Sequence, residues 1–306
     1  MRCMFTMMNN ARLGVGLEGV GIAERAYQQA LAYARERTQG RAIGAEPGVD
    51  SPIVDHPDVQ RMLLDMKATI AAMRGLCYRN AAALDHSRQA ADDDERRAAD
   101  ELAALLTPLS KSWCTDMGVE LASIGLQVHG GMGFIEETGA AQHFRDARIT
   151  PIYEGTNGIQ AIDLAGRKLG LRQGGVVRDH LAAIAATIAA LDGVDELAPV
   201  ARHLAAALEA VTEATEQLLA RSGEAPADLL AAAAAYLDMM ALTTAADGLA
   251  TGALSARAAG DDAADEAALL ARFFATTRLA AVPARLAAVT AGADDLRAAR
   301  DTLFTL

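Results

Sequence analysis

Apolar residues recur at helical spacing along almost the whole chain, and no segment alternates apolar and polar residues as a strand does. Aromatic residues make up only 4% of the sequence, so a core must be built from small and aliphatic side chains, which suits closely packed helices. The sequence therefore predicts an all-α fold. The pattern is most regular in four alanine-rich stretches, at residues 179–191, 197–219, 227–256 and 265–291.

The first half of the chain predicts four main helices. The pattern places them at about residues 10–37, 57–85, from 92 onward, and from Pro108 to a glycine turn at 127–134. Two shorter helical pieces follow at 142–148 and 157–169, and Asn157 and Gln160 are spaced like a capping box at the start of the second piece.

Gly170, Gly174 and Gly175 form a predicted linker between the two halves. Because 306 residues suffice for two domains, we expect a helical domain over residues 1–170 and a further helical bundle over residues 176–306.

Charge and cysteine content exclude several classes of protein. A formal net charge of -12 argues against a nucleic-acid partner, since phosphate binding needs clustered Lys and Arg. Cys3, Cys77 and Cys114 are too few and too scattered for a disulfide framework or a zinc site, and the six histidines show no metal-ligand spacing. We expect no metal and a reducing cytoplasmic location.

No segment of the sequence predicts a membrane span or a signal peptide. The most apolar stretch, residues 229–256, is mostly alanine and is interrupted by Asp238 and Asp247, which favours a buried core helix. The N-terminus lacks a basic region followed by an uninterrupted apolar run.

Gly14, Gly16 and Gly19 match the spacing of a dinucleotide-binding motif, but the context is wrong for one. No strand precedes them, and the helical pattern continues through Gly21 and Ala23. We interpret these glycines as a small-residue face against which another helix packs closely.

Glu154 lies in the sequence Tyr153-Glu154-Gly155-Thr156, just before a predicted helix. A glutamate in this position is most often a charge that complements the helix N-terminus. It is also a residue type that acts as a general base when it is desolvated. The residues alone leave both interpretations open.

Five segments occur here in the same order as in the acyl-CoA dehydrogenases, which strengthens the second interpretation. They are Asn9 to Arg12, Glu36 to Gln39, the Gln127 to Phe134 turn, Arg145 to Arg148, and Tyr153 to Thr156. The chain thus resembles the C-terminal portion of that family, a four-helix bundle that binds FAD and supplies the base. The opening residues and the helical region after Gly170 most resemble the long branch that includes 3-methylthiopropanoyl-CoA dehydrogenases.

The resemblance implies roles for individual residues. Glu154 would remove the proton alpha to a thioester carbonyl while FAD takes a hydride from the beta carbon. Arg12, Tyr153 and Gly155 would contact the acyl-CoA substrate. The expected FAD contacts, some of them to a neighbouring subunit, are Arg37, Gln39, Gln127, Gly130, Gly131 and Thr156. Gly40 and Gly158 depart from the family pattern, since many members carry Phe and Gln there.

The resemblance also implies partners and leaves one alternative open. We expect a homo-oligomer that passes electrons to an acceptor such as electron-transfer flavoprotein. Family members carry two further domains ahead of this region, so the sequence predicts an incomplete active site with weak or no activity for this chain alone. The alternative is a non-catalytic helical assembly module that binds no flavin.

Overall fold

The computed structural model describes residues 2–304, and within that range it contains helices and turns but no β-strand. Thr38 and Pro52 form a single isolated β-bridge there. The all-α prediction is therefore confirmed.

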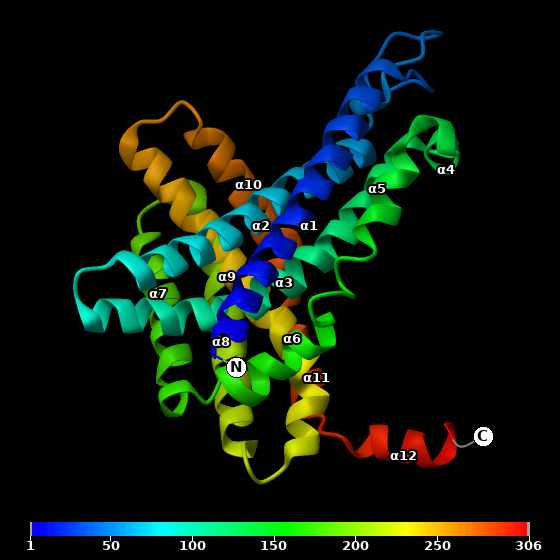
Figure 1. Cartoon of the computed structure of the whole chain (residues 1–306). Helices are drawn as coiled ribbons and strands as arrows, with labels where there is room; N and C mark the ends of the chain where they lie inside the picture. The colour runs from blue at the N-terminus through cyan, green and yellow to red at the C-terminus, as the bar shows by residue number, and fades with distance from the viewer. Residues whose placement is uncertain (1, 305–306) are drawn as a thin grey trace.

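Three long helices build the first half of the chain: α1 (Arg2–Glu36), α2 (Pro57–Gln89) and α3 (Asp93–His129). They pack along one another, and the short helix α5 (Ala140–Ala147) lies against α1 and α3 (Figure 1). The four-residue helix α4 (Gly131–Phe134) follows α3, and α6 (Asn157–Asp163) follows the loop after α5.

The predicted helix boundary at Pro108 is wrong, because α3 runs through this proline without a break. Pro108 removes one backbone donor and crowds the preceding turn, which in an isolated helix costs about 3 kcal/mol. Here Pro108 is buried on the helix that packs against both α1 and α2. Tertiary packing therefore keeps helical a segment that local propensity would interrupt.

Two glycines allow α1 and α3 to approach each other closely, as the sequence predicts. A Cβ atom at Gly16 would lie 2.7 Å from the Ser110 carbonyl oxygen, and one at Gly19 would lie 2.4 Å from the Cys114 carbonyl oxygen. Gly14 and Gly21 instead face open space. Two of the three glycines in the pattern, Gly16 and Gly19, therefore form a helix-packing surface.

The second half of the chain contains six helices within the described residues: α7 (Gly175–Ala190), α8 (Ala198–Arg221), α9 (Pro226–Ala259), α10 (Ala264–Thr277), α11 (Leu286–Thr290) and α12 (Asp294–Thr302). The prediction of one helix over residues 265–291 is wrong. Two 3-10 turns, Leu279–Ala281 and Pro283–Arg285, interrupt it, and Pro283 supplies no backbone donor at the second turn. The helix α12 extends away from the others (Figure 1).

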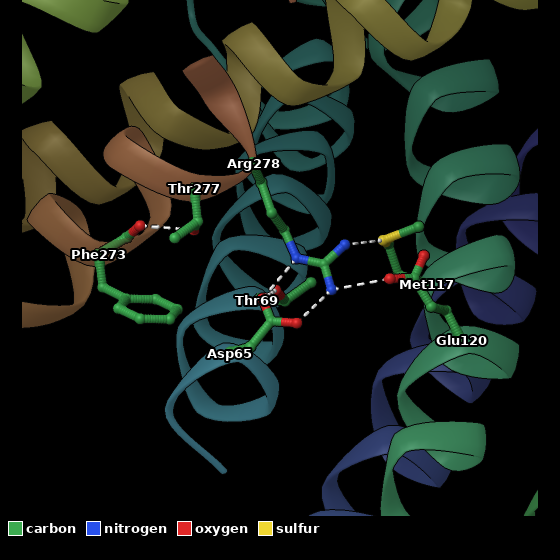
Figure 2. A network of polar contacts seen from close by, with 7 residues as sticks. All are labelled: Asp65, Thr69, Met117, Glu120, Phe273, Thr277 and Arg278. Atoms are coloured by element: carbon green, nitrogen blue, oxygen red, sulfur yellow. Dashed lines mark hydrogen bonds and ion pairs between the residues drawn. The ribbon is translucent and has the colours of Figure 1, made fainter. Parts of the chain in front are cut away.

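The two halves share one continuous hydrophobic core. Helix α9 packs against α2, α3 and α6, and the rings of Trp113 and Phe274 meet edge to face with centroids 6.3 Å apart. Arg278 adds a polar link, since it binds Asp65 on α2 and Glu120 on α3 (Figure 2). The division at residues 170–176 stays a prediction.

Two segments are long and apolar enough to cross a membrane by length and composition alone. They are Pro226–Ala259 and Ala264–Thr290, and the apolar windows in them are 72% and 39% buried inside the protein. A buried core helix passes the same test, so the test is weak evidence for a span. The high burial of the first segment agrees with its expected place in the core.

Candidate active site

Glu154 lies in the loop between α5 and α6 and has an unusual backbone conformation. Its φ of 56° is in the left-handed region, and Gly155 follows with a φ of 84°. Glycine adopts this region freely, but for a non-glycine residue it costs on the order of 1–3 kcal/mol. The surrounding contacts must therefore hold Glu154 in place.

Arg12 and Gln160 provide those contacts. The Arg12 Nε donates to the Glu154 carbonyl oxygen over 3.4 Å. The Gln160 Nε2 donates to the carbonyl oxygens of Glu154 and Gly155 over 3.4 and 3.3 Å. Arg12 is itself buried and lies 3.5 Å from the carboxylate of the buried Asp163. Arg12 thus binds groups of this chain, and the predicted contact of Arg12 with substrate stays a prediction.

Thr156 caps helix α6, so the predicted capping box at Asn157 and Gln160 is wrong. The Thr156 hydroxyl accepts a hydrogen bond from the Ile159 amide over 3.3 Å. The side chain of Asn157 turns instead toward α3, where its Oδ1 accepts from the Lys111 Nζ over 2.8 Å. Thr156 therefore caps α6, and the adjacent Asn157 fastens this helix to α3.

Lys111 is a fully buried cation in the polar layer beside this loop. Burial lowers the pKa of Lys111 to about 8, and the charge of Arg12 lowers it further, whereas Asp116 and Glu154 act in the opposite direction. Lys111 is thus a desolvated cation close enough to Glu154 for the charge of that carboxylate to influence its pKa.

Tyr153 links the loop to α1 through its hydroxyl, which donates to the Glu18 carboxylate. Burial, followed by this hydrogen bond, raises the pKa of Tyr153 to about 12. Because Arg12 and Glu18 both lie on α1, that helix holds the loop at Tyr153 and at Glu154.

Four of the predicted FAD contacts lie together at the opposite end of α1. They line a cavity of about 270 Å³, together with Tyr33 and His129, whose rings stack with centroids 4.6 Å apart. The four residues are Arg37, Gln39, Gly130 and Gly131. The fifth predicted contact, Gln127, is exposed on the last turn of α3 and does not line this cavity.

Thr156, the sixth predicted FAD contact, borders a different cavity of about 560 Å³ beside α6. Asp116 and Glu120 from α3 and Arg148 from the preceding loop also border it. Sequence reasoning assigned no individual role to these three residues, although Arg148 ends one of the segments that carry the resemblance. Only the spacing of Asp116 and Glu120, which places them on one face of a helix, could have suggested that they act together.

Within residues 2–304, no group of three or more His, Cys, Asp or Glu side chains is arranged to hold a metal ion.

The helical fold, the strained glutamate beside a helix-capping threonine and the separate glycine-lined cavity together define a class of protein. The model described as acyl-CoA dehydrogenase, C-terminal domain matches residues 1–169, so the chain belongs to the acyl-CoA dehydrogenase family. A second model, described as acetyl-CoA dehydrogenase C-terminal like, matches residues 180–300.

Curated relatives agree with this assignment. The chain is 48% identical over 228 residues to 3-methylmercaptopropionyl-CoA dehydrogenase of Ruegeria pomeroyi, covering 74% of this chain and 38% of the relative. It is 38% identical over 186 residues to a butyryl-CoA dehydrogenase of Syntrophomonas wolfei, covering 61% and 30%. The chain thus spans well under half the length of these relatives.

Solved structures show the same fold at low sequence identity. An acyl-CoA dehydrogenase from Bacillus anthracis, solved in complex with FAD, matches 94% of this chain and 49% of its own with a TM-score of 0.76 at 20% identity. ACDH-11 from Caenorhabditis elegans, in complex with C11-CoA, matches 97% and 47% with a TM-score of 0.76 at 19% identity. Both matches extend over the two halves of the chain.

Proposed function

We propose that this chain supplies the catalytic-base region of an FAD-dependent acyl-CoA dehydrogenase, which introduces a double bond between the alpha and beta carbons of an acyl-CoA thioester. The observation that carries the proposal is the strained backbone of Glu154, held by Arg12 and Gln160. Strain of this kind persists where the surrounding structure fixes it, often at active sites.

Glu154 is the residue that removes the alpha proton in this proposal. An alpha proton is too weakly acidic for a carboxylate in water, so the base must be oriented and shielded. Glu154 is half-buried, and the loop contacts fix its backbone. FAD supplies the chemistry that accepts the hydride from the beta carbon.

The cavity near Gly130 fits the phosphate portion of FAD. The Arg37 guanidinium lines it and makes no hydrogen bond or ion pair to any residue among 2–304. Added Cβ atoms at Gly130 and Gly131 would meet nothing within 4 Å. The Arg37 guanidinium can pair with a diphosphate, and the backbone of Gly130 and Gly131 can approach it closely. Arg37, Gln39, Gly130 and Gly131 would therefore hold the diphosphate of FAD in this cavity.

The two groups of predicted cofactor contacts are far apart, which favours a homo-oligomer. Arg12 contacts the loop that precedes Thr156, and Glu36 precedes Arg37 of the other cavity. These two residues of α1 are 24 positions apart, or about 36 Å by helical rise. This distance exceeds the length of one FAD molecule. We therefore propose that the cavity at Gly130 and the cavity at Thr156 serve two FAD molecules, shared between subunits.

Names of relatives support further proposals on partners. The two curated relatives described above are named for short acyl-CoA substrates. A relative from Acetobacterium woodii, 28% identical over 158 residues, is a subunit of a caffeyl-CoA reductase-Etf complex. We accordingly propose a short acyl-CoA substrate, electron-transfer flavoprotein as acceptor, and a cytoplasmic location.

The first experiment is the visible absorption spectrum of the purified chain after incubation with FAD and desalting, with its size in solution measured alongside. We expect retained flavin absorbance in an oligomer, and reduced retention in Arg37→Met. Arg41→Met is the matched control, since Arg41 is also exposed but does not line the cavity. A colourless wild-type protein would contradict flavin binding and favour the assembly module.

The variant Glu154→Gln tests the base. Because this chain alone is expected to be weakly active, butyryl-CoA should bleach the flavin of the wild type only slowly. We expect the variant to retain FAD as the wild type does but to lose this slow bleaching. Bleaching at the wild-type rate would rule out Glu154 as the base. Loss of FAD retention would instead assign Glu154 a structural role in the loop.

A further inference from the structure

The loop that carries Glu154 is closed by the backbone of Asn157. The Asn157 amide donates to the Pro151 carbonyl oxygen over 3.0 Å. Glu154 and Gly155, with their left-handed φ angles, lie between these two residues. Because this hydrogen bond joins the two ends of the loop, a movement of Asn157 changes the backbone between them. The position of Asn157 therefore affects the conformation of Glu154.

The side chain of Asn157 is fixed on α3, and its neighbours determine its orientation. Its Nδ2 donates to the Ser112 carbonyl oxygen and to the Thr115 hydroxyl, each over 3.0 Å. A carbonyl oxygen only accepts, so the amide nitrogen faces Ser112 and the Asn157 Oδ1 faces the Lys111 ammonium, 2.8 Å away. The Thr115 hydroxyl gives its proton to the Lys111 carbonyl oxygen over 2.8 Å. Lys111 Nζ is thus the donor that holds Asn157 Oδ1.

A buried ammonium is a costly group at this position. Lys111 is fully buried, and within residues 2–304 no carboxylate lies within 4 Å of its Nζ, whose one hydrogen bond is the bond to Asn157. Burial lowers the pKa of Lys111 to about 8, because the protein disfavours its charged form. A hydrogen bond from a charged donor is stronger than one from a neutral donor. The ammonium therefore holds Asn157 more firmly than a hydroxyl or an amide would.

We propose that Lys111 is a positioning residue for Glu154: its ammonium holds Asn157 on α3, and Asn157 keeps the loop in the conformation that orients the base. The proposal rests on the proposed function for the role of Glu154 as that base. Arg12 attaches the loop to α1 through the Glu154 carbonyl oxygen, and Lys111 provides a second attachment, to α3. Lys111 acts through Asn157 and does not touch substrate.

The experiment follows the bleaching of flavin absorbance by butyryl-CoA in the FAD-loaded wild type, Lys111→Met and Asn157→Ala. Methionine removes the ammonium but keeps a long unbranched side chain. We expect the bleaching rate at saturating butyryl-CoA to fall about ten- to a hundredfold in Lys111→Met, as for a base displaced by about 1 Å. FAD retention and the half-saturating butyryl-CoA concentration should stay unchanged. A change in those two quantities alone would overturn the proposal, because Lys111 would then shape a binding site instead.

The double variant Lys111→Met/Asn157→Ala tests whether the two residues act as one unit. If Lys111 acts only by holding Asn157, the double variant should bleach at the rate of Asn157→Ala. If the two losses multiply, Lys111 acts on Glu154 by another route, such as its charge, and that result would overturn the proposal.

Asn80→Ala is the control for lost stability. Asn80 is buried on α2 and donates to the hydroxyls of Thr107 and Ser110 on α3 over 3.4 and 3.2 Å. The variant also breaks buried hydrogen bonds to α3, but none of them involves the Glu154 loop. We expect lower stability in urea with an unchanged bleaching rate. An equal loss of bleaching in Asn80→Ala would refute a positioning role, because any weakening of the bundle would then slow the reaction.

A measurement that needs no flavin separates this proposal from the proposed function. Hydrogen exchange of the Asn157 amide, followed by NMR, reports the opening of its bond to the Pro151 carbonyl. We expect about tenfold faster exchange in Lys111→Met and no change in Asn80→Ala. If the wild type retains no FAD but exchange rises in this way, the proposed function is wrong and Lys111 still positions the loop. Unchanged exchange in Lys111→Met refutes the positioning role.

Discussion

The closest contact between α1 and α3 predicts that Gly19→Ala destabilises the protein. The new Cβ would lie 2.4 Å from the Cys114 carbonyl oxygen, 2.9 Å from its carbon and 3.1 Å from the Thr115 Cα. All three are backbone atoms, so no side-chain rotation relieves the overlap. The two helices must move apart.

The magnitude follows from the required movement. Ordinary contact begins at 3.4 Å, so the separation must grow by 3.4 minus 2.4, or 1.0 Å. A gap of this size forfeits about a quarter to a half of the attraction at neighbouring contacts, and overpacking costs about 1–3 kcal/mol. Alanine has a higher helix propensity than glycine, and this difference offsets about 1 kcal/mol of the packing cost. Taking the upper cost, because the obstacle is backbone, we expect the free energy of unfolding to fall by about 2 kcal/mol.

Gly14→Ala and Gly21→Ala are the matched controls on the same helix. Neither added Cβ would meet any atom within 4 Å, so the gain in helix propensity should raise stability by about 0.5–1 kcal/mol. Urea denaturation at one protein concentration measures all three variants. The reasoning is refuted if Gly19→Ala is as stable as Gly14→Ala.

Two further predictions concern Gly155 and His180. Gly155→Ala places a side chain at a left-handed φ of 84°, with the new Cβ only 3.0 Å from the Gln160 Nε2. We expect the free energy of unfolding, measured by urea denaturation, to fall by about 1–2 kcal/mol. In the control Gly158→Ala, the Cβ would meet only the Thr156 hydroxyl at 3.8 Å, so stability should not change. Burial, aided by the charge of Arg79, lowers the pKa of His180 to about 3. In the unfolded chain His180 is protonated as the pH falls below about 6.5, whereas in the folded chain it stays neutral. The free energy of unfolding should therefore fall by about 2 kcal/mol between pH 6.5 and 5. Parallel pH profiles for the wild type and His180→Gln would contradict this.

The fold class could be predicted from the sequence because helical periodicity is a local property. The errors arose where contacts between distant segments decide the outcome. Nothing near Pro108 shows that α3 continues through the proline, packed against α1 and α2. In the same way, the capping-box spacing at Asn157 does not show that its side chain binds Lys111, 46 residues earlier.

Only the residues of the Tyr153–Thr156 motif at the candidate site could be predicted from the sequence around Glu154. The sequence around Glu154 identified the residue by resemblance, but not the contacts that hold it. The bond from Arg12 joins residues 142 positions apart, and the left-handed backbone has no signal other than the following glycine. The separation of the predicted FAD contacts into two cavities depends on the length and direction of α1, which no motif encodes.

The glycines of α1 connect the packing of the bundle to the geometry of the site. Gly16 and Gly19 lie one and two turns beyond Arg12 on the same face of the helix, so the close contact that they allow also sets the distance of Arg12 from the Glu154 loop. The loop is fastened to α3 by Asn157, and the bond from Arg12 Nε to the Glu154 carbonyl already measures 3.4 Å. A shift of α1 by the 1.0 Å calculated above would stretch that bond past hydrogen-bonding range. A glycine pattern that resembles a nucleotide motif therefore bears on the site through helix packing alone.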